Sequence, residues 1–351
     1  MQTSPETYEF TFNGLRFIFK TKGEAIQEID ILLNTPPPPP PPPPIPQIDL
    51  SKYTSNTFQA LEKGFKTGQT IYLENELTAE TGINFTIPGV SYIGGTFRTK
   101  LSTMPNELIT ARVPISFNQT TFSGLGDDYR DQVAPYDLVK AVGSGLIFDK
   151  CVFEHHQQYL LELHNANQPI VKDCLVRYGQ NGISFNGKCQ GGVVEGNTIY
   201  DCSQAPIKIR GCTATTVRDN KIELAYNYWK AFDHLRFPGT DGKGIEGHNS
   251  QGSQGIYFGV TDPMPCFSCE VYNNEINDYS NHKLRSEGVW FPMDAGSVKS
   301  ENNRFHNNTI NGSYYGIHIA EYLTRFPQPL YAYDNQINNV VKNEYREENQ
   351  V

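Results

Sequence analysis

Five basic and aromatic residues of this chain have the clearest capacity for chemistry, and we call them the basic–aromatic strip. Lys208 and Arg210 each follow an isoleucine, so alternation in an extended strand turns the isoleucines inward and exposes the two cations. The same parity in later stretches exposes Tyr257, Trp290 and His318. Aromatic planes stack on sugar rings and basic groups pair with acidic sugars, which predicts substrate binding here. The alternative is ordinary surface aromatics, which sheets favour anyway.

Two long excursions from the pattern flank the strip, residues 223–254 and residues 277–294. Insertions in repeat proteins usually cluster on the binding side, and loops carry function disproportionately. We therefore expect Trp229 in the first excursion and Arg285 in the second to contribute to substrate binding.

Two kinds of sugar chemistry fit the residues near the strip. Glycoside hydrolysis needs two carboxyl groups about 5–9.5 Å apart, and Asp294 with Glu321 is the best pair, with His318 beside it. A lyase would instead use a base beside a cation that neutralises the substrate carboxylate, and Lys208, Arg210 and His318 could serve there. Neither arrangement is a motif, and both remain open.

The sequence predicts no cofactor and no transition-metal site. Cys266-Phe-Ser-Cys269 is a single CxxC without a second pair, which is insufficient for zinc. Calcium is possible at Asp127, Asp128 and Asp131, although a solvated loop tip is the favoured interpretation.

The elements that must position these residues repeat along the chain. Cys151, Cys174, Asn197 and Asn220 are 23 residues apart each time. Each follows a hydrophobic residue by three positions (Phe148, Val171, Val194 and Val217) and precedes another by two (Phe153, Val176, Ile199 and Ile222). A period of about 20–30 residues built from short β-type segments is typical of a solenoid in which each repeat forms one coil.

The fold class predicted is therefore all-β, a single-stranded parallel β-helix of about ten coils at the repeat length of a solenoid. A helix is expected over residues 53–67, capped by Asn56 and with Phe58, Leu61 and Phe65 on one face. Placed before the first coil, it would cover the open end of the β-helix. The cysteines 23 apart are expected to be packed free thiols; disulfides between adjacent coils are the alternative.

Residues 1–34 are predicted to be a separate ββα docking domain. Alternating hydrophobic residues on both sides of Asn13-Gly14 predict a hairpin, since this pair favours a type I′ turn. Hydrophobic residues at helical spacing then predict a helix (Ile26, Ile29 and Leu33). So small a unit buries too little surface alone, so we expect it to dock on a partner or on sister copies; folding back on the β-helix is the alternative.

Nine consecutive prolines, Pro36 to Pro44, predict a stiff polyproline linker over residues 35–50. The β-helix is then expected over residues 51–345. The net charge of −9 argues against nucleic acid as partner, because phosphate neutralisation requires a basic surface. The chain has no apolar run long enough for a membrane span and no N-terminal signal pattern.

Several strings resemble the opening coils of right-handed parallel β-helix proteins: Phe58-Gln-Ala-Leu, Gly68-Gln-Thr-Ile-Tyr-Leu and Ile87-Pro-Gly-Val-Ser-Tyr-Ile-Gly-Gly. The resemblance covers about residues 50–340. It implies the pectate-lyase-like superfamily, which includes lyases, epimerases and phage tailspikes. None of the enzymes' diagnostic strings is present, so only a polysaccharide substrate is implied, and no residue role.

A docking domain, a rigid spacer and a capped β-helix together look most like a virion tailspike or tail-fibre protein. This resemblance implies a homotrimer that binds a host surface polysaccharide, attached to the virion through residues 1–34. A polysaccharide lyase or glycoside hydrolase is the alternative function, and the cell surface or extracellular space is the alternative location.

Overall fold

A computed structural model of the chain describes residues 6–12, 15–22, 25–33, 47–99, 107–124, 136–224, 254–259, 265–279, 286–291, 300–319 and 330–342. The chain divides into two units, Met1–Pro44 and Ile45–Val351. Each unit is described by itself.

The N-terminal unit contains a three-stranded antiparallel sheet. It consists of β1 (Glu6–Phe12), β2 (Leu15–Lys22) and β3 (Ala25–Leu33), in that order. The predicted hairpin is present, because Phe12 of β1 pairs with Leu15 of β2. The predicted helix is wrong, since its residues form β3.

A β-bulge explains why β3 resembles a helix in the sequence. Thr21 pairs with Ile26 and Lys20 pairs with Glu28, so Gln27 is an extra residue in the ladder. An extra residue makes the spacing of hydrophobic positions three at that point, whereas a regular strand has two. From Ile29 onward the alternation is that of an ordinary strand.

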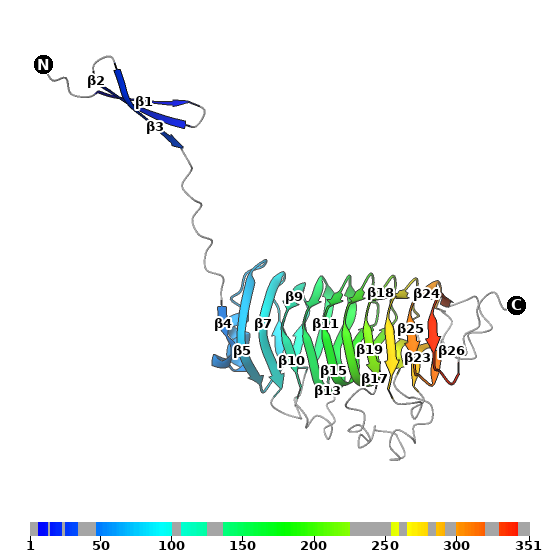
Figure 1. The fold of residues 1–351 in the computed structure, drawn as a ribbon. Helices are drawn as coiled ribbons and strands as arrows, with labels where there is room; N and C mark the ends of the chain where they lie inside the picture. The colour runs from blue at the N-terminus through cyan, green and yellow to red at the C-terminus, as the bar shows by residue number, and fades with distance from the viewer. Residues whose placement is uncertain are drawn as a thin grey trace. The chain divides into compact units, whose positions relative to one another are not determined.

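The second unit is a parallel β-helix whose coils stack side by side, each with three strand positions (Figure 1). The first face comprises β4 (Gln47–Asp49), the first part of β5 (Thr70–Ala79), the first part of β7 (Val90–Thr99), β9 (Ile115–Asn118), β12 (Leu146–Asp149), β14 (Ile170–Lys172), β16 (Val193–Glu195), β18 (Thr216–Arg218), β21 (Glu270–Tyr272), β24 (Asn303–His306) and β27 (Leu330–Tyr333).

The second face comprises the later parts of β5 and β7, β10 (Thr121–Ser123), the first parts of β13 (Val152–Asn167), β15 (Leu175–Asn186) and β17 (Thr198–Arg210), then β19 (Lys221–Leu224), β22 (Glu275–Asp278), β25 (Thr309–Asn311) and β28 (Gln336–Asn338). The third face comprises β6 (Ile83–Phe85), β8 (Ile109–Ala111), β11 (Val139–Ser144), the later parts of β13, β15 and β17, then β20 (Gln254–Gly259), β23 (Glu287–Phe291) and β26 (Tyr315–Ile319).

Stacked hydrophobic side chains fill the interior, as the repeat predicts. Val171, Val194 and Val217 are paired in consecutive coils and fully buried. Earlier coils carry phenylalanines at the same position, and the rings of Phe117 and Phe148 stack with centroids 5.6 Å apart. Because each coil contributes one row to a continuous core, an inward charge would interrupt the rows on both sides.

A buried ladder of amides and thiols stabilises one corner of the coils. The Asn197 amide donates to Oδ1 of Asn220, and the Asn220 amide donates to Oδ1 of Asn274, each at 2.9 Å. Cys174 lies in the same ladder, where its thiol donates to the Phe148 carbonyl at 3.6 Å. All seven cysteines are buried thiols, as predicted for the pairs that lie 23 residues apart.

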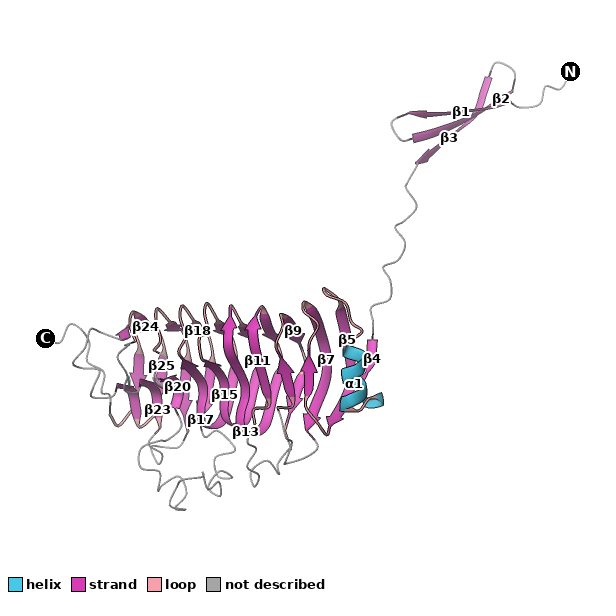
Figure 2. Cartoon of the chain, turned by 180° about the vertical axis from the view of Figure 1, so that it is seen from behind, coloured by secondary structure: helices cyan, strands magenta, loops and turns pink. Residues whose placement is uncertain are grey.

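The helix α1 (Ser55–Glu62) lies at the end of the β-helix beside β4 (Figure 2). Phe58 is fully buried between Phe85 and Phe97. The Glu62 carboxylate accepts hydrogen bonds from the backbone N–H groups of Thr86 and Ile87 at 2.8 and 3.0 Å. The helix thus covers the first coils, and it is shorter than residues 53–67.

Two boundaries differ from the sequence prediction. Thr54 caps α1 in place of Asn56, because its hydroxyl accepts from the backbone N–H of Thr57 and the Thr57 hydroxyl accepts from that of Thr54. The β-helix also starts before residue 51, since β4 pairs with β5 and a short 3-10 helix, Leu50–Lys52, follows it. The predicted linker over residues 35–50 therefore ends too late.

Candidate functional site

Four residues of the basic–aromatic strip form one outward column on the third face. Lys208 of β17 pairs with Tyr257 of β20, Tyr257 pairs with Trp290 of β23, and Trp290 pairs with His318 of β26. Neighbouring positions on these strands, such as Val289, are fully buried. The alternation of inward and outward positions is as predicted, and coil stacking sets the steps of the column at about 4.8 Å. The expected exposure of Lys208 is wrong, because its side chain lies against the rings of Tyr159 and Tyr257 and is buried.

Lys208 is held under the aromatic part of the strip and is only 8% exposed. Its ammonium lies 4.9 Å from the ring centroid of Tyr257 and donates to the hydroxyl of Tyr159 at 3.1 Å. Tyr159 belongs to β13, two coils earlier, where it pairs with Asn181 of β15, so the lysine side chain reaches back past the intervening coil.

Burial makes Lys208 readily titratable. Desolvation lowers the pKa of Lys208 to about 8, and the positive charge of Arg210 acts in the same direction. Burial raises the pKa of Tyr159, so this residue remains a phenol at neutral pH. The site therefore pairs an amine that can lose its proton with a hydroxyl that keeps its own.

The aromatic part of the strip continues this arrangement. The rings of Tyr257 and Trp290 meet edge to face with centroids 5.0 Å apart, and both side chains are half-buried. His318 stacks on Tyr315 with centroids 4.6 Å apart, and its Nδ1 lies 2.7 Å from a carboxylate oxygen of Glu287. The partly exposed rings present flat apolar surface, which is the kind of surface that a sugar ring contacts.

A group of charged residues, which we call the carboxylate cluster, continues the column on earlier coils. It consists of Glu107, Asp137, Lys140 and Glu162. Lys140 of β11 pairs with Glu162 of β13, which pairs with Ser184. The Lys140 ammonium lies 2.8 Å from Glu162, 3.6 Å from Asp137 and 3.9 Å from Glu107.

The two most enclosed carboxyl groups of the cluster share a proton. Burial and a hydrogen bond to Glu162 raise the pKa of Asp137. Burial opposes ionisation of Glu162 as well, but hydrogen bonds from Asp137, Lys140 and Asn186 outweigh it and lower its pKa. Asp137 is therefore the protonated partner and Glu162 the ionised one.

The remaining predicted site residues lie outside the described residues: Trp229, Arg285, Asp294 and Glu321, together with the calcium candidates Asp127, Asp128 and Asp131. Arg210 is half-buried and follows Lys208 by two positions on the same strand, opposite Gly259.

Sequence reasoning missed Tyr159, Asp137 and Glu162. Alternation along the strand could have identified Glu162 as an outward residue, because it lies between the inward residues Leu161 and Leu163. No pattern in the sequence singles out Asp137.

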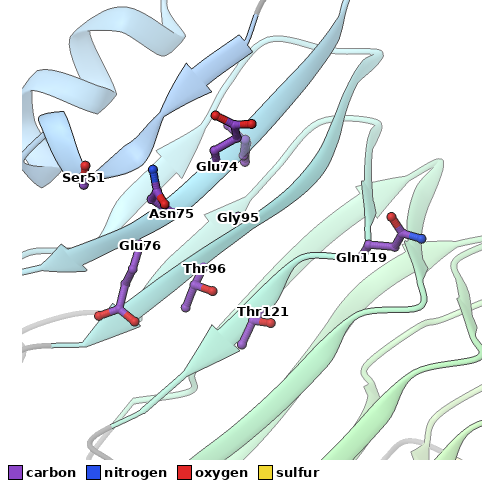
Figure 3. Close-up of a pocket in the computed structure, with 9 residues that line it drawn as sticks. Ser51, Glu74, Asn75, Glu76, Gly95, Thr96, Gln119 and Thr121 are labelled. Atoms are coloured by element: carbon purple, nitrogen blue, oxygen red, sulfur yellow. The ribbon is translucent and has the colours of Figure 1, made fainter.

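Away from the strip, a hollow of about 1030 Å³ lies over the first coils (Figure 3). Its lining is mostly polar and includes Gly95, which has a φ of +71°. Glu76 pairs with Arg98 at 3.0 Å, and Glu74 accepts from Gln47. No aromatic ring lines it, so it offers a saccharide less than the strip does.

Two absences concern only the part of the chain that the structure describes. Within it, no three His, Cys, Asp or Glu side chains are arranged to hold a metal ion. No helix there has the length and apolar character needed to cross a bilayer.

Comparison with models of protein families identifies the family of the chain. The model described as a right-handed β-helix region matches residues 136–343, which is more than half of the sequence. The chain belongs to the right-handed β-helix family. This result confirms the resemblance seen in the sequence, while a search of curated proteins finds no match.

Solved structures of other β-helix proteins are similar to this chain at low sequence identity. ORF18 of Geobacillus virus E2 is 10% identical with a TM-score of 0.44, over 93% of this chain and 68% of that one. The A-module of the mannuronan C-5 epimerase AlgE6 of Azotobacter vinelandii is 13% identical with a TM-score of 0.45, over 85% and 97%. The Dettilon tailspike protein is 13% identical with a TM-score of 0.35, over 78% and 60%.

Proposed function

We propose that this protein recognises a polysaccharide along the third face of its β-helix. The observation that carries the proposal is the single outward column of Lys208, Tyr257, Trp290 and His318 on consecutive coils. Three steps of about 4.8 Å span about 14 Å, which suits an extended polymer better than a single small molecule.

The layout of the chain favours a recognition protein of a virus particle. A separate small sheet precedes a run of nine prolines, and the β-helix follows. In this proposal the β-helix is a tailspike-type or tail-fibre-type module that binds a host surface polysaccharide. The N-terminal sheet attaches it to the virion, and copies of the chain associate as a homotrimer.

A substitution of Trp290 tests the binding surface. Trp290→Ala should weaken binding of a recognised polysaccharide by about 1–3 kcal/mol, the range of an aromatic hot spot, with little change in melting temperature. Tyr333→Ala is the matched control, because Tyr333 is an outward aromatic residue on the first face and is 42% exposed. Equal loss in both variants, or none in either, would refute the assignment of the strip.

A second candidate function, cleavage of the bound polymer, is favoured by the contact between Lys208 and Tyr159. In β-elimination the neutral Lys208 amine takes the proton from the carbon beside a sugar carboxylate. That electron pair forms a C=C bond, and the bond to the glycosidic oxygen breaks. Tyr159 donates its proton to the departing oxygen, and the Lys208 ammonium returns a proton to Tyr159 along their 3.1 Å hydrogen bond.

This activity has a direct assay. Each cleavage leaves one unsaturated sugar end, whose ultraviolet absorbance increases with time. Tyr159→Phe should abolish the increase and retain binding. Binding by the unaltered protein without any unsaturated product would leave recognition as its function and reject cleavage by elimination.

A further inference from the structure

The column that carries the basic–aromatic strip changes sign of charge along its length. Lys140, Glu162, Ser184 and Lys208 are paired in that order on successive coils. Glu162 and Lys208 are therefore two steps, or about 10 Å, apart. A polymer bound along the strip would pass both positions.

The carboxylate cluster carries a net negative charge at neutral pH. Lys140 offers one positive charge to three carboxyl groups within 4 Å. Asp137 keeps a proton beside Glu162, so two of the three carboxyl groups carry charge. One negative charge remains after Lys140 is counted. An anionic sugar placed here meets repulsion.

The Lys208 end of the column has the opposite character. Lys208 and Arg210 provide two cations on one strand, and the protonated form of Lys208 predominates below about pH 8. Opposite charges at this separation attract, and like charges repel, by energies that are substantial in partly buried sites. An acidic sugar is therefore favoured at Lys208 and disfavoured at Glu162.

We propose that the strip selects a heteropolysaccharide in which acidic sugars are separated by uncharged or amino sugars, and rejects polymers with an acidic group on every sugar. The acidic sugar lies at Lys208 and Arg210, and an uncharged or amino sugar lies at the carboxylate cluster. The inference rests on the proposed polysaccharide binding and specifies the substrate class. Its selectivity comes from repulsion at one position as well as attraction at another.

An array of purified surface polysaccharides of known repeating unit, probed with the full chain, tests the selection. The expected ligands have isolated acidic sugars, while polygalacturonate and neutral dextran bind weakly. Preference for polygalacturonate or for dextran would overturn the inference and leave polysaccharide binding intact. Absence of binding to every polymer would reject the proposed function, and the inference with it.

Amide variants of the carboxylate cluster test whether its negative charge causes the selection. Because Asp137 and Glu162 share one proton, Asp137→Asn or Glu162→Gln alone leaves one ionised carboxylate and should scarcely change binding. The double variant removes the negative charge and should bind polygalacturonate about tenfold more tightly. Glu195→Gln is the control, since Glu195 is an outward carboxylate on the first face, 2.7 Å from Arg218.

Two results of the variant series contradict the inference. One is a double variant that is folded, by circular dichroism, and still rejects polygalacturonate as the unaltered protein does. The other is an equal gain in the Glu195→Gln control. If the double variant does not fold, the array with the unaltered protein decides the question by itself.

Discussion

The buried amide ladder provides a sharp test of how the coils are held together. Asn274 is 1% exposed, and its side chain makes hydrogen bonds to the coil before and the coil after. Its Oδ1 accepts from the backbone N–H and the side chain of Asn220, at 3.1 and 2.9 Å. Its Nδ2 donates to Val217 O, Tyr272 O and Oδ1 of Asn308, each within 3.0 Å.

Replacing Asn274 by alanine removes these five bonds together. The Oδ1 atom of Asn308 still accepts from the backbone N–H of Asn274. The Tyr272 carbonyl still accepts from the backbone N–H of Asp219. The buried N–H of Asn220 loses the partner described above. Net losses of about 0.5–1.5 kcal/mol for each of the four other bonds, and about 1–3 kcal/mol for the orphaned N–H, indicate a cost of about 3–9 kcal/mol. This is a large part of a typical stability of about 5–15 kcal/mol.

Urea unfolding followed by circular dichroism measures this cost. Asn277→Ala is the matched control on the same coil. The Asn277 amide is half-buried and bonds outward to Glu275 and Asn311, where water can replace the lost bonds, so its cost should stay below about 1 kcal/mol. Asn274→Cys should fall between the two, because Cys174 occupies the equivalent position of an earlier coil. Equal unfolding midpoints for Asn274→Ala and Asn277→Ala would refute the reasoning.

Three further predictions concern the core, the strip and the N-terminal unit. Val194→Asp should prevent folding, because an unpaired charge in a stacked core costs several kcal/mol; a soluble variant with an unchanged circular dichroism spectrum would contradict the register. Since the pKa of Lys208 is about 8, its positive charge disappears as the pH rises through that value. Affinity for an acidic polysaccharide, measured by titration calorimetry, should fall there, and Lys208→Arg should remove the dependence. Deleting residues 1–44 should leave the melting temperature of the β-helix unchanged while abolishing attachment to its partner; a much lower melting temperature would reject the docking role.

The basic–aromatic strip was predictable from sequence in its parity and its membership. Alternation along Ile207–Arg210 is a local property, and β-strand geometry converts it directly into inward and outward positions. The repeat then places Lys208, Tyr257, Trp290 and His318 in one column, because each coil returns the chain to the same face. What these residues contact is not set by alternation.

The cap and the first strands show where local patterns fail. Ile26, Ile29 and Leu33 satisfy the spacing of a helix, yet strand pairing with β2 and one bulge produce the same spacing in β3. Thr54 caps α1 in place of Asn56, because both the hydroxyl of Thr54 and that of Thr57 accept a backbone N–H of the other. Strand pairing and reciprocal hydrogen bonds depend on which groups lie close together in the folded chain. The spacing of residues along the sequence does not contain that information.

The sequence by itself determined a coiled, repeating β architecture, since a 23-residue period with inward hydrophobic residues has few other stable arrangements. Only the tertiary structure brought Tyr159 to Lys208 and Asp137 to Glu162, and so produced a titratable lysine and a shared proton. The coils that carry these residues differ in length, because the number of residues from Glu162 to its partner Ser184 is not the number from Ser184 to its partner Lys208. The physical reason is that desolvation and proton sharing depend on distances between coils, which the period fixes for backbone positions and leaves open for side chains.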